Sequence, residues 1–322
     1  MTWGRLAVAA AMGLWLALRP PRVPDPAFDP VLLEGGVDAY LEAAEARFTD
    51  IREGLQKQVV WAGVPGAKTD WVVVYIHGFS ASLGEIRPVP ERVAEGLGAN
   101  LVLTRLQGHG RSGAAMGEAT FTGWMEDVSE ALAIAQAVGR RTLVISTSTG
   151  STLTALTLYG RSAEGVAGTI FVAPNFRLRN RKTGLVTWPG ARLWLPLLIG
   201  RERGFTPANA AHGHFWTSRY PSVALLPMGK AVRALAARDP GLLKTPALFV
   251  FDDRDALVDH ARTRELAALW GGPVDCAQIP LLANPASGYV VNPDGSSRLN
   301  TSVLMSVSIL MVVLSTSRDV RE

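Results

Sequence analysis

The stretch that decides the fold reads Thr142-Leu-Val-Ile145, then Ser146-Thr147-Ser148-Thr149-Gly150, then Ser151-Thr-Leu-Thr-Ala-Leu-Thr-Leu158. The first part is apolar and predicts a strand, the last part predicts a helix, and the pentapeptide between them predicts a tight turn with Ser148 at its centre. A serine hydroxyl is a weak nucleophile unless the backbone presents it beside a base and oxyanion donors. The stretch therefore predicts a serine nucleophile on a strand-to-helix elbow, and its partners decide the function.

Strand-like and helix-like segments alternate on both sides of this elbow. The clearest helix runs from about Gly123 to Val138, with its apolar residues on one face. A run such as Trp71–Ile76 is apolar on both faces, as a parallel strand covered by helices must be. The predicted fold of residues 31–322 is therefore a three-layer α/β fold with a mostly parallel sheet. The predicted strands are Gln56–Trp61, Trp71–Ile76, Leu101–Thr104, Thr142–Ile145, Thr169–Ala173, Ala247–Phe251 and Asp275–Ile279.

Length and composition describe one globular domain. The chain has 322 residues, of which 48% are hydrophobic and 19% are charged, so it can bury a large core. A formal net charge of +4 is too diluted over this length to predict nucleic-acid binding. Cys276 is the only cysteine, which excludes an intramolecular disulfide. The sequence has no phosphate-binding glycine loop, dinucleotide turn or metal-ligand spacing, so we expect no metal and no cofactor.

The first thirty residues predict a membrane attachment outside this domain. Leu6 to Leu18 is an apolar stretch preceded by Arg5 and followed by a proline-rich linker up to Pro30. No small-x-small cleavage site follows it, so an uncleaved anchor is favoured over a cleaved signal peptide. At ~1.5 Å per residue the stretch spans about 20 Å of a ~30 Å membrane core, so flanking residues must help. We expect a membrane-attached protein with a single N-terminal anchor in residues 1–30; the alternative is a buried amphipathic helix.

Three motifs in sequence order carry a resemblance to a known family. His77-Gly78-Phe79 follows one predicted strand, Gly108-His109-Gly110-Arg111-Ser112 follows the next, and the Ser148 elbow comes third. Together they resemble the α/β-hydrolase superfamily, in particular the branch of bacterial carboxylesterases, monoglyceride lipases and lysophospholipases. The resemblance covers roughly Gln56 to Ile279. It implies an α/β-hydrolase fold with a helical cap insertion.

The resemblance also implies that the backbone N–H groups of Phe79 and Thr149 form the oxyanion hole. Two such donors stabilise the negative oxygen of a tetrahedral intermediate, and one donor is worth about 3 to 4 kcal/mol. The elbow departs from the usual Gly-x-Ser-x-Gly pattern because Ser146 replaces the first glycine. Glycine is favoured where the helix returns close to the strand, and serine is among the smallest replacements. We therefore expect the turn to form.

The acid of the catalytic triad is expected to follow a later strand. Ala247–Phe251 is followed by Asp252-Asp253-Arg254-Asp255-Ala256-Leu257-Val258. The family carries an aspartate at such a strand end, two residues before an apolar pair that starts a helix, and Asp255 fits this best. A buried acid there would orient the base and stabilise its cation. The alternatives, expected as solvated or capping carboxylates, are Asp252, Asp253 and Asp259.

The general base is missing from its expected place. The resemblance puts a histidine in the loop after the last predicted strand, where this chain has Gly288 or Tyr289. Neither is a general base near neutral pH, since the ordinary pKa of tyrosine is near 10. His77 and His109 are expected to be structural. Three explanations remain open: a degenerate hydrolase that keeps only its pocket, a substitute histidine with His214 as the first candidate, or a tail altered beyond about residue 279.

An insertion at about residues 175–244 predicts the helical cap. Trp188 and the run from Leu193 to Ile199 are strongly apolar and suit either an acyl-chain pocket or the core of the cap itself. Basic residues at the start of the insertion could meet lipid headgroups or phosphate, although a solvated loop is the simpler interpretation. These residues are Arg177, Arg179, Arg181 and Lys182.

These observations predict a serine hydrolase of carboxylic esters, with lipid-like acyl esters preferred and no nucleic-acid partner. In this hypothesis Ser148 attacks the carbonyl, Phe79 and Thr149 hold the oxyanion, and Asp255 supports the base. The alternative is a catalytically impaired protein that binds an acyl ligand or a partner through the same pocket.

Overall fold

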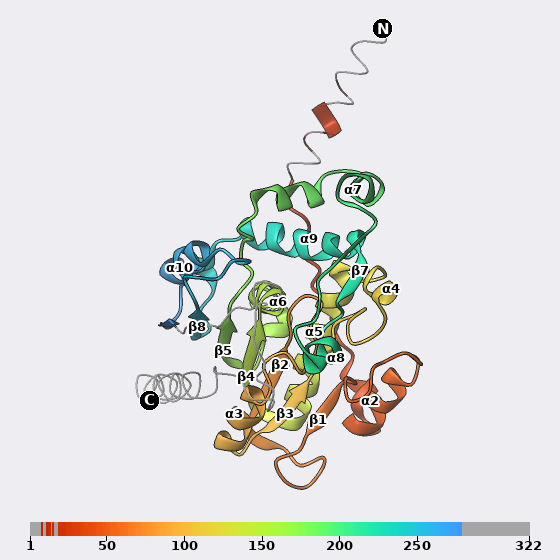
Figure 1. Cartoon of the computed structure of the whole chain (residues 1–322). Helices are drawn as coiled ribbons and strands as arrows, with labels where there is room; N and C mark the ends of the chain where they lie inside the picture. The colour runs from red at the N-terminus through yellow and green to blue at the C-terminus, as the bar shows by residue number, and fades with distance from the viewer. Residues whose placement is uncertain (1–7, 9–10, 14, 16–18, 279–322) are drawn as a thin grey trace.

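The central sheet of the computed structural model, which describes residues 8, 11–13, 15 and 19–278, has seven strands in the order β1-β3-β2-β4-β5-β8-β9 (Figure 1). Within it β1 is antiparallel to β3, and every other neighbouring pair is parallel. The predicted three-layer α/β architecture is therefore confirmed. The strands are β1 Gln58–Val60, β2 Thr69–Ile76, β3 Asn100–Leu103, β4 Gly139–Thr147, β5 Val166–Val172, β8 Ala247–Phe251 and β9 Val274–Gln278.

Helices cover both faces of the sheet because its central strands are apolar on both faces. On β2, Val72 and Val74 belong to one core, whereas Val73 and Tyr75 belong to the other. Residues of α5, α6, α9 and α10 complete the first core, and residues of α3 contribute to the second. These helices are α3 Val89–Leu97, α5 Phe121–Val138, α6 Thr149–Thr157, α9 Leu225–Ala236 and α10 His260–Leu269.

Shorter elements connect these layers. They are η1 Pro30–Leu33, α2 Val37–Glu45, α4 Gly113–Met116, η2 Arg161–Ala163 and η5 Pro240–Leu242. Helix α2 lies at the β1 edge of the sheet (Figure 1), where Leu41 reaches the first core.

The register of β2 and β4 determines where the candidate site forms. Ile76 at the end of β2 is opposite Ser146 near the end of β4. Because the two strands are parallel, the residues that follow them emerge at the same carboxyl edge of the sheet, where ligands bind in open α/β sheets. Strand β8 ends at the same edge, since β5 pairs in parallel with both β4 and β8.

Between β5 and β8 the chain leaves the sheet and forms a separate set of short elements. A small core of their own contains Val186, Ala191, Leu195 and Leu226. Figure 1 shows α7 on the side of α9 that faces away from the sheet, whereas α9 itself packs on the main core. The predicted cap boundaries at about residues 175–244 stay a prediction. The elements are η3 Arg181–Thr187, α7 Ala191–Ile199, β6 Glu202–Gly204, α8 Ala210–Phe215, β7 Arg219–Pro221 and η4 Ser222–Ala224, with β6 and β7 forming an antiparallel pair that the sequence did not predict.

The N-terminal segment requires a correction. Most of Leu6–Leu18 lies outside the described residues, and in the described part of the chain we find no helix with the length and apolar character needed to cross a membrane. The prediction of a membrane-attached protein with a single N-terminal anchor is therefore wrong. Part of the proline-rich linker packs on the domain: the carbonyl of Pro26 accepts a 2.9 Å hydrogen bond from Ser129 of α5, and Val23 contacts the main core.

Candidate active site

Ser148 lies at the turn between β4 and α6 in a backbone conformation that L-residues rarely adopt. Its φ of 49° and ψ of −112° place it outside the common regions. Its N–H donates to Val172 O at 3.0 Å, and its carbonyl accepts from Asn175 N at 3.0 Å. Such strain persists only where the surroundings hold the residue, and it clusters at active sites. The backbone thus presents a partly exposed Ser148 side chain at the carboxyl edge of the sheet.

Close packing of α6 on β2 explains which residues the elbow needs. A Cβ added at Gly150 would lie 2.6 Å from the carbonyl oxygen of His77 and closer still to that of Ile76. Glycine is required here because the helix passes directly over the main chain that follows β2. Ser146, in place of the other usual glycine, is fully buried, and its carbonyl accepts a 2.8 Å hydrogen bond from Ser151 Oγ. The elbow forms with serine at this position.

The turn that follows β2 lies against the elbow. A Cβ added at Gly78 would lie 3.1 Å from Ser148 Cβ. The N–H groups of Phe79 and Thr149 have no hydrogen-bond acceptor among the described residues. An oxyanion hole needs such free donors beside the nucleophile. The geometry agrees with the predicted oxyanion hole, whose role stays a prediction.

Asp255 differs from the other carboxylates of its loop. It is buried at the end of β8, and its Oδ1 accepts hydrogen bonds from Leu257 N at 2.7 Å and Val258 N at 3.0 Å. In the described part of the chain its carboxylate forms no ion pair, whereas each alternative has an arginine partner. These pairs are Asp252 with Arg254, Asp253 with Arg264 and Asp259 with Arg177. Its assignment as the acid therefore stays the preferred prediction.

Two histidines are built into the core behind the turn. Nε2 of His77 accepts from Leu106 N at 3.1 Å, so Nδ1 carries the proton and donates to the carbonyl of Gly78 at 2.9 Å. The ring of His109 packs against that of His77, with centroids 4.9 Å apart. Burial lowers the pKa of His77 to about 4 and the pKa of His109 well below its ordinary value. Both are neutral packing residues at physiological pH.

The three remaining histidines are His212, His214 and His260. His212 is bonded through Nδ1 to a main-chain N–H, and Nε2 of His214 lies 3.0 Å from the carbonyl of Glu53. His260 begins α10. All five histidines are among the described residues, and none of them is hydrogen-bonded to Ser148.

Positions 288 and 289 lie outside the described residues. Gly288 and Tyr289 are the positions where the resemblance expects the histidine, and the tail beyond residue 279, one of the three explanations left open by the sequence, also lies outside the described residues.

The insertion packs directly over the turn that follows β2. Thr217 N donates to the carbonyl of Ser80 at 2.6 Å, and the Phe215 ring fills the space that a side chain at Gly84 would need. The guanidinium of Arg52 holds the same segment by donating to carbonyl and hydroxyl oxygens at 2.8 to 3.2 Å. This segment therefore covers the turn that follows β2.

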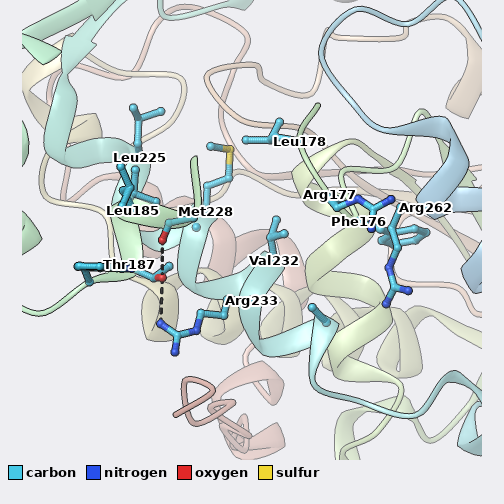
Figure 2. Close-up of a pocket in the computed structure, with 15 residues that line it drawn as sticks. Phe176, Arg177, Leu178, Leu185, Thr187, Leu225, Met228, Val232, Arg233 and Arg262 are labelled. Atoms are coloured by element: carbon cyan, nitrogen blue, oxygen red, sulfur yellow. Dashed lines mark hydrogen bonds between the residues drawn. The ribbon is translucent and has the colours of Figure 1, made fainter. Parts of the chain in front are cut away.

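A cavity of about 960 Å³ lies between η3, helix α9 and the start of α10, and Figure 2 shows its lining. Its walls are mostly apolar, with Leu185, Met228 and Val232 among them, but neither Ser148 nor Asp255 lines it. Three arginines also line it, and each has a partner: Arg177 pairs with Asp259, Arg262 with Glu265, and Arg233 donates to Thr187. The cavity is therefore adjacent to the site and not part of it.

The apolar run of the insertion divides between the two roles that the sequence left open. Leu195 of α7 is 2% exposed and belongs to the small separate core. Leu193 and Leu197, on the same helix, are 80% and 82% exposed, and Trp188 is about half exposed. Of this group Trp188 lines the cavity. The run thus supplies part of the insertion's own core and an exposed apolar surface.

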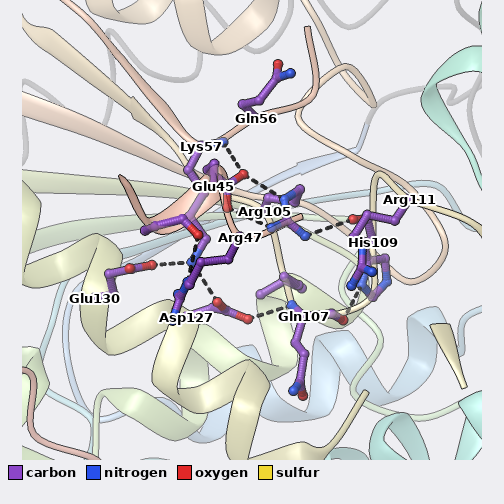
Figure 3. Close-up of polar contacts among 12 residues, drawn as sticks. Glu45, Arg47, Gln56, Lys57, Arg105, Gln107, His109, Arg111, Asp127 and Glu130 are labelled. Atoms are coloured by element: carbon purple, nitrogen blue, oxygen red, sulfur yellow. Dashed lines mark hydrogen bonds and ion pairs between the residues drawn. The ribbon is translucent and has the colours of Figure 1, made fainter. Parts of the chain in front are cut away.

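A second polar cluster joins the end of α2, the residue before β1, the loop after β3 and helix α5, and Figure 3 shows its contacts. Arg105 donates to both carboxylate oxygens of Glu45, at 2.7 and 2.8 Å, and Lys57 pairs with Asp127 and Glu130. Burial opposes the charge of Lys57, yet its two carboxylate partners outweigh burial and raise its pKa. Each of these charged groups has a partner of opposite charge, and no metal-binding group of three or more His, Cys, Asp or Glu side chains occurs among the described residues. We interpret this cluster as structural.

Sequence reasoning missed one charged residue beside the site. Glu85 lies in the loop after β2, is 3% exposed, and its Oε2 accepts from Gly78 N at 2.7 Å and Tyr75 Oη at 2.9 Å. Burial raises the pKa of Glu85 to about 7, although these two hydrogen bonds act in the opposite direction. The only signal in the sequence is an acidic residue between the apolar residues Leu83 and Ile86, and no motif marks it.

Solved structures with the same fold include lipolytic enzymes at low sequence identity. One structure from the pair of metagenome-derived lipolytic enzymes LipS and LipT shares 18% identity with a TM-score of 0.60, over 84% of this chain and 99% of the other. A soluble variant of monoglyceride lipase from Saccharomyces cerevisiae shares 12% with a TM-score of 0.55, over 94% and 96%. Paleococcus ferrophilus monoacylglycerol lipase shares 12% with a TM-score of 0.54, over 81% and 99%. These likenesses confirm the fold.

A family profile covers most of the described domain. No curated protein matches this sequence. The profile of Hydrolase_4, described as serine aminopeptidase S33, matches residues 67–276, from the start of β2 to β9. This range contains the Gly78 turn, the Ser148 elbow and the Asp255 loop. The chain therefore belongs to the Hydrolase_4 (serine aminopeptidase S33) family of α/β-hydrolases.

Proposed function

We propose that the protein is a serine hydrolase of carboxylic esters, with lipid-like acyl esters as preferred substrates. The observation that carries this proposal is the strained Ser148 elbow, packed against the Gly78 turn with the free N–H groups of Phe79 and Thr149 close by. The lipolytic enzymes and monoglyceride lipases among the similar structures support the substrate class.

In the proposed reaction Ser148 Oγ attacks the ester carbonyl carbon while its proton passes to a base. The carbonyl oxygen becomes negative, and the N–H groups of Phe79 and Thr149 donate to it. The intermediate collapses and expels the alcohol, which takes up the proton, and water then hydrolyses the acyl ester formed on Ser148. Asp255, held by two main-chain N–H groups, would orient that base.

A second candidate function follows from the placement of the histidines. All five are described, and none is hydrogen-bonded to Ser148. Loss of the triad histidine costs on the order of 10⁶ in kcat in a serine protease. The alternative is therefore a catalytically impaired α/β-hydrolase that binds an acyl ligand, for which the apolar cavity of about 960 Å³ offers space.

One experiment separates the two functions. The purified protein is treated with a fluorophosphonate probe and assayed with short-chain and long-chain acyl esters, beside Ser148→Ala and Ser112→Ala. Ser112 is an exposed serine at the start of α4 and serves as the matched control. Gly288→His and Tyr289→His each put a histidine at one of the two positions where the family resemblance expects it. His214→Ala tests the substitute base.

Ester turnover and probe labelling that survive Ser112→Ala but disappear in Ser148→Ala support the hydrolase. Loss of activity in His214→Ala would then assign the base. If the parent shows neither labelling nor turnover and either added histidine restores both, the protein is the impaired member and the first proposal is wrong.

A further inference from the structure

Glu85 is a buried carboxyl group that the proposed reaction does not use. It comes from the loop between β2 and α3, and its two hydrogen-bond donors are the Gly78 N–H and the Tyr75 hydroxyl, both to Oε2. A buried carboxylate is costly even when it is hydrogen-bonded, and a glutamine would fill the same space without charge. Its place beside the site therefore needs an explanation other than stability.

The carboxyl group lies next to the proposed nucleophile. A Cβ added at Gly78 would lie 2.7 Å from Glu85 Oε1 and 3.1 Å from Ser148 Cβ, so both side chains approach the same face of Gly78. The Tyr75 hydroxyl that bonds to Glu85 also lies 3.1 Å from Oγ1 of Thr147, the residue before Ser148. One buried hydrogen-bonded chain thus joins the turn to the elbow.

The main chain on both sides of Gly78 is held by side chains. Glu85 accepts from the Gly78 N–H, and Nδ1 of His77 donates to the Gly78 carbonyl at 2.9 Å. That carbonyl belongs to the same planar peptide as the Phe79 N–H. In a trans peptide the two groups point in opposite directions, so fixing the carbonyl fixes the direction of the N–H. The Phe79 N–H itself is left without an acceptor among the described residues.

We propose that Glu85 is a positioning residue of the oxyanion hole, which holds the Gly78 main chain so that the Phe79 N–H points at the oxygen of the reacting carbonyl. This inference rests on the proposed function of Ser148 and Phe79. Glu85 acts as a hydrogen-bond acceptor and does not touch the substrate. Removing the acceptor should therefore slow the chemical step while leaving substrate binding nearly unchanged.

The test compares Glu85→Leu, which removes the acceptor, with Glu85→Gln, which keeps an acceptor oxygen. Ser82→Ala is the matched control, because Ser82 lies in the same loop, is fully buried, and its hydroxyl has no partner among the described residues. Misplacing a catalytic group by about 1 Å can cost roughly 100-fold. We expect Glu85→Leu to lose roughly 100-fold in kcat with KM within about threefold of the parent, and Glu85→Gln to recover most of this loss.

A second readout does not depend on catalysis. In ¹⁵N-glycine-labelled protein the Gly78 amide resonance should shift with pH as Glu85 titrates, and this shift should be absent in Glu85→Gln. If the parent shows no turnover or labelling while the Gly78 resonance titrates as expected, the proposed function has failed and the contact stands. A Gly78 amide resonance that is the same in Glu85→Leu as in the parent, or a Glu85→Leu variant with the kcat of Ser82→Ala, overturns the proposal. An equal fall in kcat in Glu85→Leu and Glu85→Gln also overturns the proposal, because catalysis would then depend on the charge of Glu85 and not on its acceptor oxygen.

Discussion

Replacing Glu85 by glutamine should make the folded protein more stable than the parent at alkaline pH. At acidic pH the two proteins should differ little in stability. Glutamine keeps the shape of the side chain and an acceptor oxygen for Gly78 N and Tyr75 Oη, but it has no charge to bury. The difference in the free energy of unfolding between the two proteins therefore reports the cost of ionising Glu85 in the folded state.

The magnitude follows from the pKa of Glu85, which burial raises from 4.5 to about 7 in the folded protein. Because the folded state holds its proton more tightly than the unfolded state, this group's contribution is fully present below pH 4.5 and is lost as the pH rises through about 7. Each unit of pKa difference is worth about 1.4 kcal/mol, so the loss is about 3 kcal/mol. Between about pH 5 and pH 8 the advantage of Glu85→Gln should grow by about 2 to 3 kcal/mol.

Urea unfolding of both proteins, followed by tryptophan fluorescence across this pH range, measures the difference. His77 and His109 also have lowered pKa values, but burial keeps both rings neutral in the folded state of either protein over this pH range, so their contributions are the same in both. Tyr75→Phe removes a donor to Glu85 and should move the loss of stability to higher pH. A difference between Glu85→Gln and the parent that stays constant across the range would refute the reasoning, because the buried carboxyl group would then titrate alike in both states.

Two further predictions concern packing and buried charge. Gly150→Ala should destabilise the protein by about 1 to 3 kcal/mol in urea unfolding, because its Cβ would overlap the main-chain oxygens of Ile76 and His77. If the variant were instead more stable than the parent, as the helix propensity of alanine alone would predict, the close packing of the elbow on β2 would be contradicted. Lys57→Met should cost about 3 to 5 kcal/mol, because it leaves the carboxylates of Asp127 and Glu130, whose side chains are 14% and 10% exposed, without their cation. Arg140→Met is the control, because the Arg140 side chain is 75% exposed and its loss should cost less than about 1 kcal/mol. If both variants lose the same free energy of unfolding, the Lys57 ion pairs contribute no more than an exposed surface pair, and the prediction is wrong.

The sequence predicted the sheet well because its strands are apolar on both faces. A run such as Trp71–Ile76 has few other stable environments, and the observed strand, Thr69–Ile76, starts two residues earlier. The Ser148 elbow and Asp255 were predicted at strand ends because the chain order of strands and loops is visible in the sequence. The β6–β7 pair was missed because three-residue strands carry too little periodicity to detect. The membrane anchor was predicted wrongly from a short apolar run whose length falls below that of a spanning helix.

The sequence by itself determined the three-layer α/β architecture and the position of Ser148 directly after β4. It also determined that Gly288 and Tyr289 stand where the family resemblance expects a histidine. These properties follow from local patterns, which depend on residues near one another in the chain. Only the tertiary structure decided that Glu85 and His77 hold the two sides of Gly78, and that His214 lies against Glu53 with no hydrogen bond to Ser148. Those contacts depend on how the parallel strands stack in register and on which side chains the insertion and the loop after β2 bury together. Such packing has no local pattern from which it could be predicted.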